Sequence, residues 1–147
     1  MSHFLVCCGF DKFGDCLLHF SAIVSCLGHD AGHTGYTNRF LIETRSPLAL
    51  TYNDKSPLEN MHASTLFSVL WAQSEPDTDI TKNLSREECK MFRRYCIQMI
   101  LATDNGNHEK VIKKMRNNDE RLFRAAIHAA DLGGAGKVRS HIYTFKN

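Results

Sequence analysis

The sequence predicts an all-α protein, folded as an irregular multi-helix bundle. Three observations carry this prediction. The first two are that apolar residues recur at helical spacing in most segments and that these segments start and stop with helix signals. A third is that no strand-like alternation flanked by hairpin turns occurs. The chain has 147 residues, of which 43% are hydrophobic and 23% charged, which is enough for one domain with a single core.

The first predicted helix covers residues 13–30, with Asp15 near its start and leucine, isoleucine and valine along its apolar faces. Three glycines then interrupt the pattern and end the helix. A short helix is predicted over residues 37–44, capped by Thr37 or Asn38.

Two Ser-Pro pairs begin the next two predicted helices, at residues 46–52 and 56–73. Proline suits the first helical position because its missing N–H would have no partner there. The second of these helices has an apolar stripe at helical spacing, which indicates packing on one side. Residues 74–83 are polar and are predicted to form a connector.

The last three predicted helices differ in polarity. A mostly buried helix at residues 85–104 starts with Ser85 and Glu88, which have the spacing of a capping box. A more polar helix follows at residues 107–117. An amphipathic helix at residues 119–134 ends in two glycines, a common helix terminator.

Composition excludes several classes of partner. A net charge of +2 is too small to favour nucleic acid or an anionic membrane. No segment approaches the roughly 18 to 20 apolar residues that span a bilayer. The six cysteines form no C-x-x-C pair and fall partly in apolar helical patterns, so we expect small core residues of a reduced, cytoplasmic protein.

The segment HDAGHTG, at residues 29–35, combines two imidazoles with a carboxylate. His29 and His33 are four residues apart, so a helical backbone would place both on one face beside Asp30. Imidazole and carboxylate ligands suit Zn²⁺, Mn²⁺ or Fe²⁺. Two such ions about 3.5 to 4 Å apart can hold a hydroxide and a phosphate. The alternative is that these residues are only a polar helix end.

Three more polar positions lie in apolar surroundings. Glu59 falls on the predicted apolar side of its helix, Asp104 follows Thr103 at the end of an apolar helix, and Asp131 ends an alanine-rich one. A buried carboxylate needs a charged or hydrogen-bonding partner, and a metal ion could provide it. The alternatives are a surface glutamate for Glu59, an ordinary helix cap for Asp104, and, for Asp131, an ion pair with an arginine such as Arg94 or Arg139.

Four segments occur in an order that resembles one family: HDAGHTGYTNRFLI, PLALTYNDKSPLENMH, ILATDNGNH and IHAADL. Together they resemble the catalytic domain of class I 3′,5′-cyclic-nucleotide phosphodiesterases. The resemblance covers about residues 17–137, so we interpret residues 1–147 as one truncated, partial catalytic domain of that all-α type.

The resemblance implies hydrolysis of cAMP, cGMP or both to the 5′-nucleoside monophosphates. It implies two divalent metal ions, Zn²⁺ and Mg²⁺ with Mn²⁺ as an alternative, and a hydroxide activated by both as the nucleophile. It also implies a longer parent protein with regulatory domains, or a homodimer, as further partners, and through the parent an association with membranes.

The resemblance assigns three groups of residues. The metal ligands are His29, Asp30 and Asp131. The catalytic residues, which hold water molecules on the second metal, are His33, Glu59, Thr103 and Asp104. The substrate-binding residues are Asn38, which braces the loop after the metal motif, and Leu132, near the nucleotide pocket.

The sequence departs from the family pattern at several points. It has no motif of the Tyr-His-Asn type, which in the family supplies a further metal ligand and the histidine that protonates the leaving oxygen. Met61 replaces a histidine, and Gly32 replaces a frequent acidic residue. We therefore expect impaired activity. Two alternatives remain open: a catalytically inactive regulatory or dimerisation remnant, and another metal phosphohydrolase with an HD motif.

Overall fold

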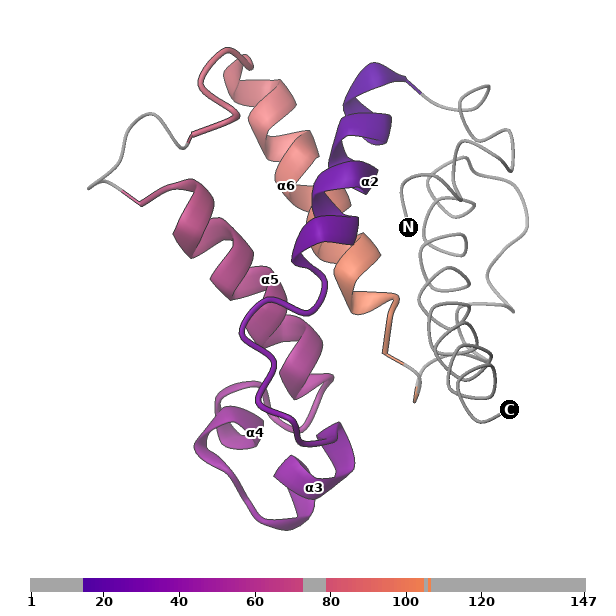
Figure 1. Ribbon diagram of the computed structural model, residues 1–147, viewed down its shortest axis with the longest axis vertical. Helices are drawn as coiled ribbons and strands as arrows, with labels where there is room; N and C mark the ends of the chain where they lie inside the picture. Colours follow the sequence, from indigo (N-terminus) through magenta and orange to yellow (C-terminus); the bar gives the residue numbers. More distant parts are fainter. Residues whose placement is uncertain (1–14, 73–78, 105, 107–147) are drawn as a thin grey trace, which may run out of the picture.

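The computed structural model describes residues 15–72, 79–104 and 106, and within these residues it contains helices but no strand. The helices are α2 (Cys16–Gly28), α3 (Asn38–Glu43), α4 (Pro47–Thr51), α5 (Pro57–Leu70) and α6 (Arg86–Leu101). Figure 1 shows α2 and α6 side by side, with α5 crossing next to them and the short helices α3 and α4 beside its first turns. None of the helices in these ranges is long and apolar enough to cross a bilayer.

Side-chain caps begin four of the five helices. The side chains of Asp15, Thr37, Ser46 and Ser85 each accept a hydrogen bond from the backbone N–H three residues later. At α6 the capping box is complete, because Glu88 accepts in return from the backbone N–H of Ser85 at 2.8 Å. The predicted capping box is therefore confirmed, and Thr37 is the cap of α3. Helix α5 begins at its predicted Ser-Pro pair but without a side-chain cap.

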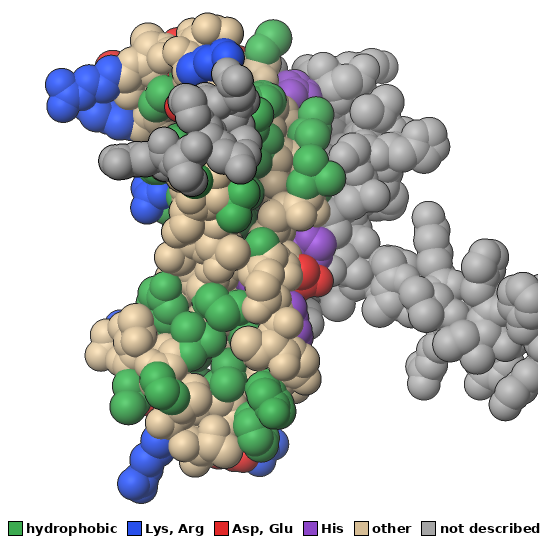
Figure 2. Space-filling model, turned by 60° about the vertical axis from the view of Figure 1, so that its left-hand side comes forward, with side chains coloured by type: hydrophobic (Ala, Val, Ile, Leu, Met, Phe, Trp, Pro, Cys, Tyr) green, Lys and Arg blue, Asp and Glu red, His purple; other side chains and the backbone are tan. Residues whose placement is uncertain are grey.

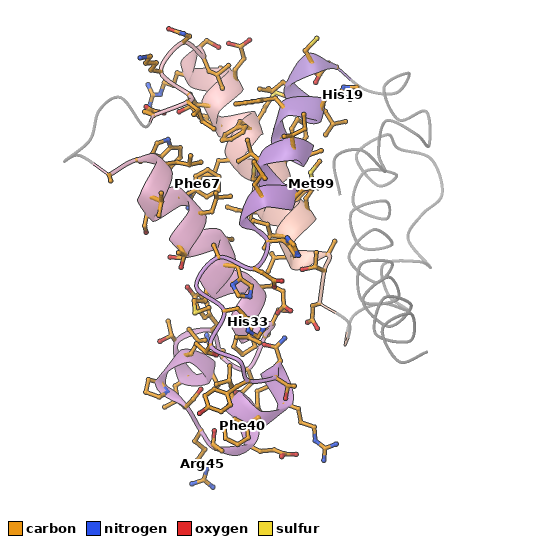
Figure 3. The ribbon with its side chains drawn as sticks, viewed as in Figure 1. His19, His33, Phe40, Arg45, Phe67 and Met99 are labelled. Carbon is orange, nitrogen blue, oxygen red and sulfur yellow. The ribbon has the colours of Figure 1, made fainter. Side chains whose placement is uncertain are left out.

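The main core lies where α2, α5 and α6 meet. Met99 of α6 is fully buried against α2, and Phe92 is fully buried between α2 and Phe67 of α5. Figure 3 shows Phe67 pointing from α5 toward α6. Burial of each such side chain is worth about 1.5–3 kcal/mol. A smaller cluster of Leu41 and neighbouring apolar residues joins α3 and α4 to the start of α5.

Two of the four described cysteines fit the expected core role. Cys26 and Cys96 are buried, and burial raises the pKa of each thiol to about 11. Cys89 is half-buried. Cys16, at the start of α2, is exposed, which differs from the expectation that the cysteines fill the core.

Gly28 allows the end of α2 to pack closely against α5. A Cβ atom at this position would lie 2.8 Å from Cδ1 and 3.2 Å from Cγ of Leu66. Those distances are shorter than van der Waals contact, so only a glycine fits without a shift of Leu66. The loop that follows α2 therefore begins directly against α5.

The observed helices are shorter than predicted at the ends that matter for the site. Helix α2 stops at Gly28 rather than at residue 30, and α6 stops at Leu101 rather than at residue 104. The predicted helices at residues 107–117 and 119–134 lie outside the described residues.

Candidate metal centre

The loop after α2 presents the first set of polar side chains. It turns because Gly32 and Gly35 adopt left-handed conformations, with φ of 72° and 82°, which glycine tolerates without steric cost. The backbone N–H of His33 donates to the carbonyl of Asp30 at 3.1 Å. A helical backbone, the condition under which His29 and His33 would share a face, is not present here, because α2 ends at Gly28 and a glycine turn follows, as the glycines predicted.

Three side chains from two segments converge next to this turn. Asp30, His33 and His62 each offer one ligand atom, and these atoms lie within 4.8 Å of one another. His62 comes from α5, is 2% exposed, and stacks on His33 with ring centroids 5.4 Å apart. Figure 2 shows histidine and acidic side chains next to one another about halfway along the molecule, and Figure 3 places His33 in that middle region.

Hydrogen bonds to the backbone set the tautomers of two histidines. Nδ1 of His29 lies 2.9 Å from the carbonyl oxygen of Cys26, and Nδ1 of His62 lies 2.8 Å from that of Ala31. A carbonyl oxygen only accepts, so Nδ1 carries a proton in both rings, and in the neutral form of each ring Nε2 holds the lone pair. This is the tautomer in which histidine binds a metal through Nε2.

Both of these Nε2 atoms face the carboxylate of Asp30. The distance is 3.4 Å from His29 to Oδ2 and 3.9 Å from His62 to Oδ1. Lone pairs on neutral imidazoles repel carboxylate oxygens at such distances, and a cation turns the repulsion into attraction, whether it is a proton on Nε2 or a metal ion between the groups. The donor set therefore fits a divalent metal ion bound at Asp30.

His33 has the opposite tautomer. Its Nδ1 accepts a hydrogen bond from the backbone N–H of Gly35 at 2.9 Å, so the neutral ring carries its proton on Nε2. In this form His33 can donate a hydrogen bond to a water molecule or a phosphate oxygen. That chemistry suits a residue that holds water better than a direct metal ligand.

Asn38 joins α3 to the first turn of α5 and holds Glu59. Its Nδ2 donates to Oε2 of Glu59 at 2.7 Å, and its Oδ1 accepts from the backbone N–H of Leu58 at 2.9 Å. Burial raises the pKa of Glu59, whereas the hydrogen bond from Asn38 lowers it and repulsion from Asp104 raises it further. The polar groups of the Asn38 amide thus point at α5.

The residues after α6 complete the described part of the site. Asp104 is 8% exposed, and its Oδ1 accepts from the backbone N–H of Gly106 at 2.8 Å. The hydroxyl of Thr103 donates to the carbonyl of Ile100 at 2.7 Å. A cavity of about 480 Å³ connects these residues with Asp30 and Glu59.

The structure brings together most of the residues that the sequence singled out. Six of them line this one cavity: Asp30, His33, Asn38, Glu59, Thr103 and Asp104. His29 lies beside it through its contact with Asp30. Asp131 and Leu132 lie outside the described residues.

Sequence reasoning missed His62. Its spacing could have indicated a role in the site, because a residue three positions after Glu59 in a helix lies on the same face as Glu59. Nothing in the sequence, however, indicated that this face meets the loop after α2.

The family of the chain follows from comparison with known proteins. The model of the 3′,5′-cyclic nucleotide phosphodiesterase family matches residues 1–141, nearly the whole chain. The chain therefore belongs to this family, as the order of its motifs predicted.

Individual relatives are longer than this chain. It is 36% identical over 127 residues to the dual specificity calcium/calmodulin-dependent 3′,5′-cyclic nucleotide phosphodiesterase 1C of Mus musculus, a match that covers 81% of this chain and 18% of that protein. It is 43% identical over 103 residues to the high affinity cGMP-specific 3′,5′-cyclic phosphodiesterase 9A of Drosophila melanogaster, covering 69% of this chain and 6% of that protein. The chain thus spans less than a fifth of either relative.

A solved structure has the same fold. The phosphodiesterase domain of the RhoPDE fusion protein from the choanoflagellate Salpingoeca rosetta superposes with a TM-score of 0.75 at 34% sequence identity. The match covers 82% of this chain and 42% of that one. The predicted all-α fold of the phosphodiesterase type is therefore confirmed, for a chain that spans less than half of that domain.

Proposed function

We propose that this chain forms the metal-binding part of a catalytic site that hydrolyses cAMP, cGMP or both to the 5′-monophosphates. The observation that carries the proposal is that Nε2 of His29 and Nε2 of His62, which come from separate segments, lie 3.4 and 3.9 Å from the two carboxylate oxygens of Asp30. The relatives support it, because their names describe enzymes of dual specificity and of cGMP specificity. Its further partners would be regulatory domains of a longer parent protein.

Two divalent ions, Zn²⁺ and either Mg²⁺ or Mn²⁺, fit the ligand chemistry. His29, His62 and Asp30 would hold the first ion, with Asp131 as a further ligand from the segment outside the described residues. Imidazole nitrogen suits Zn²⁺, whereas carboxylate and water suit Mg²⁺ and Mn²⁺. When bound, the ions would neutralise phosphate charge and lower the pKa of water.

The remaining side chains would orient water and substrate. His33 would donate from Nε2 to a water molecule or a phosphate oxygen. Glu59 and Asp104 would accept hydrogen bonds from water across the cavity, and Asn38 would keep Glu59 in place through the bond at 2.7 Å. Correct orientation of water is a large part of catalysis at metal sites.

Hydrolysis by the isolated chain is proposed to be slow. Departure of the 3′-oxygen requires a proton, and the family motif that would supply a histidine donor is absent from the sequence. The chain would then bind metal more effectively than it turns over substrate.

The test combines metal binding with hydrolysis. Binding of Zn²⁺, Mg²⁺ and Mn²⁺ is measured by calorimetry, and release of 5′-monophosphate from cAMP and cGMP is followed with each metal. Asp30→Ala and Asp131→Ala are expected to abolish binding and any hydrolysis. Glu87→Ala is the matched control, because Glu87 is exposed and pairs with Lys90 on α6, and neither residue lines the cavity. Equal metal affinity in wild type and Asp30→Ala would refute the proposal.

A further inference from the structure

Two Ser-Pro pairs in this chain begin helices in different ways. At Ser46, φ is −59° and ψ is 151°, and the side chain accepts a hydrogen bond from the backbone N–H of Ala49 at 3.2 Å. That is the usual arrangement of an N-cap before proline. At Ser56, φ is 44° and ψ is 57°, a left-handed conformation, and the side chain makes no cap hydrogen bond.

The conformation of Ser56 is unfavourable in two respects. A residue with a Cβ atom is strained at positive φ. In a residue before proline, helical values of ψ are also sterically unfavourable. Helix α5 also lacks the cap that a serine in this position would ordinarily provide. Because Ser46 shows that the same dipeptide can cap a helix without strain, another interaction must hold Ser56 in place.

That interaction is a hydrogen bond to Asp104. The hydroxyl of Ser56 donates to Oδ2 of Asp104 at 2.5 Å, across 48 positions in the sequence. The other oxygen, Oδ1, accepts from the backbone N–H of Gly106 at 2.8 Å. Both carboxylate oxygens are therefore held by donors, which fixes the plane of a nearly buried carboxylate that lines the cavity with Asp30 and Glu59.

We propose that Ser56 is a positioning residue: its strained backbone aims the hydroxyl at Asp104 and so orients that carboxylate toward the metal centre. This inference rests on the proposed function, because it assigns Asp104 a task in holding metal-bound water. A helix cap alone would not require the strained backbone of Ser56. The strain has an explanation if it places the hydroxyl where it orients a functional carboxylate.

The experiment separates fold stability from metal affinity. Ser56→Gly removes the hydroxyl and also the steric strain at positive φ, so its melting temperature in EDTA is expected to stay within about 3 °C of wild type. Its dissociation constant for Mn²⁺, measured by calorimetry on the full chain, is expected to rise at least tenfold, as is typical for lost support of a metal site. Ser56→Thr should show the reverse pattern, with lower stability and retained affinity.

The matched control is Asn53→Gly. Asn53 also has positive φ, at 52°, in the same loop, but it is exposed and does not line the cavity. Its Mn²⁺ affinity should equal that of wild type. If Ser56→Gly binds Mn²⁺ within twofold of wild type, the positioning role is overturned while the proposed function stands. If wild type itself binds no Mn²⁺, the proposed function fails and this inference fails with it.

Discussion

Replacement of Asn38 by alanine tests whether one amide joins α3 to α5. It removes a hydrogen bond to the Leu58 backbone, worth about 0.5–1.5 kcal/mol, and a hydrogen bond to the Glu59 carboxylate, worth about 1.5–3 kcal/mol. Because Asn38 and Glu59 are partly exposed, the lower half of the sum applies, or about 2–3 kcal/mol. For a chain of this size the melting temperature should fall by about 6–9 °C.

The assay is urea unfolding followed by far-ultraviolet circular dichroism, in EDTA so that metal does not contribute. The exposed Asn83→Ala is the control and should change the unfolding free energy by less than about 0.5 kcal/mol. A loss below about 1 kcal/mol in Asn38→Ala would show that water replaces both hydrogen bonds, which would refute the reasoning.

Introducing a negative charge at position 38 tests the same hydrogen bonds more directly. Asn38→Asp keeps the acceptor for Leu58 but puts a carboxylate oxygen where the amide nitrogen now lies 2.7 Å from Glu59. It should therefore destabilise the chain at neutral pH at least as much as alanine does. Adding Glu59→Gln restores a donor to the pair and should recover most of the loss. No recovery in the double variant would mean that the two side chains do not interact as described.

Three further predictions concern the helices. Phe92→Ala should lower the unfolding free energy by about 3–5 kcal/mol in urea unfolding, because this side chain is fully buried. Gly28→Ala should cost no more than about 1 kcal/mol, because the clash is with the side-chain end of the half-buried Leu66, and the cost should vanish in a Leu66→Ala background. Hydrogen bonds from Ser85 lower the pKa of Glu88, so its stabilising contribution is present above the unfolded pKa of about 4.3 and is lost as pH falls through the folded pKa. Acid titration of stability should thus be shallower in Glu88→Gln, and an unchanged slope would contradict this.

Local signals predicted helix starts well. A cap depends on one side chain and the backbone N–H three residues later, so Ser46 and Ser85 could be identified from sequence alone. Ser56 also precedes a proline at a predicted helix start, yet its hydroxyl donates a hydrogen bond to Asp104, 48 positions away. Long-range interactions of this kind override local preference and leave no trace in local spacing.

Helix ends were predicted less well than starts. The sequence predicts that the last described helix continues through residue 104, but α6 stops at Leu101. There the hydroxyl of Thr103 donates a hydrogen bond to the carbonyl of Ile100 in the last turn. Likewise, α2 was predicted through residue 30 but stops at Gly28, and a turn around Gly32 follows. Glycine and hydroxyl residues allow several terminations, and packing decides among them.

The order of the motifs predicted which residues form the candidate site, but not how those residues are arranged in space. Resemblance brought Asp30, Glu59 and Asp104 into one hypothesis, and the structure places all three around one cavity. His62 was missed because its importance depends on the carbonyl of Ala31, which lies 31 positions earlier. A single sequence does not show which face of α5 meets that loop.

The packing of α2 on α5 also sets the geometry of the metal centre. Gly28 lies against Leu66, and Ala31 accepts from His62 one helical turn earlier on the same face of α5. Residues 28–31 therefore run along this face, and the glycine contact fixes how closely Asp30 approaches His62. Gly28→Ala should consequently weaken Mn²⁺ binding even under conditions where the chain remains fully folded, because any part of the clash that Leu66 does not absorb shifts residues 28–31 from α5 and lengthens the 3.9 Å separation between Asp30 and His62. Leu18→Val loosens a core cluster that does not include Leu66, near the start of α2, so it should lower stability and leave the affinity of the folded chain unchanged.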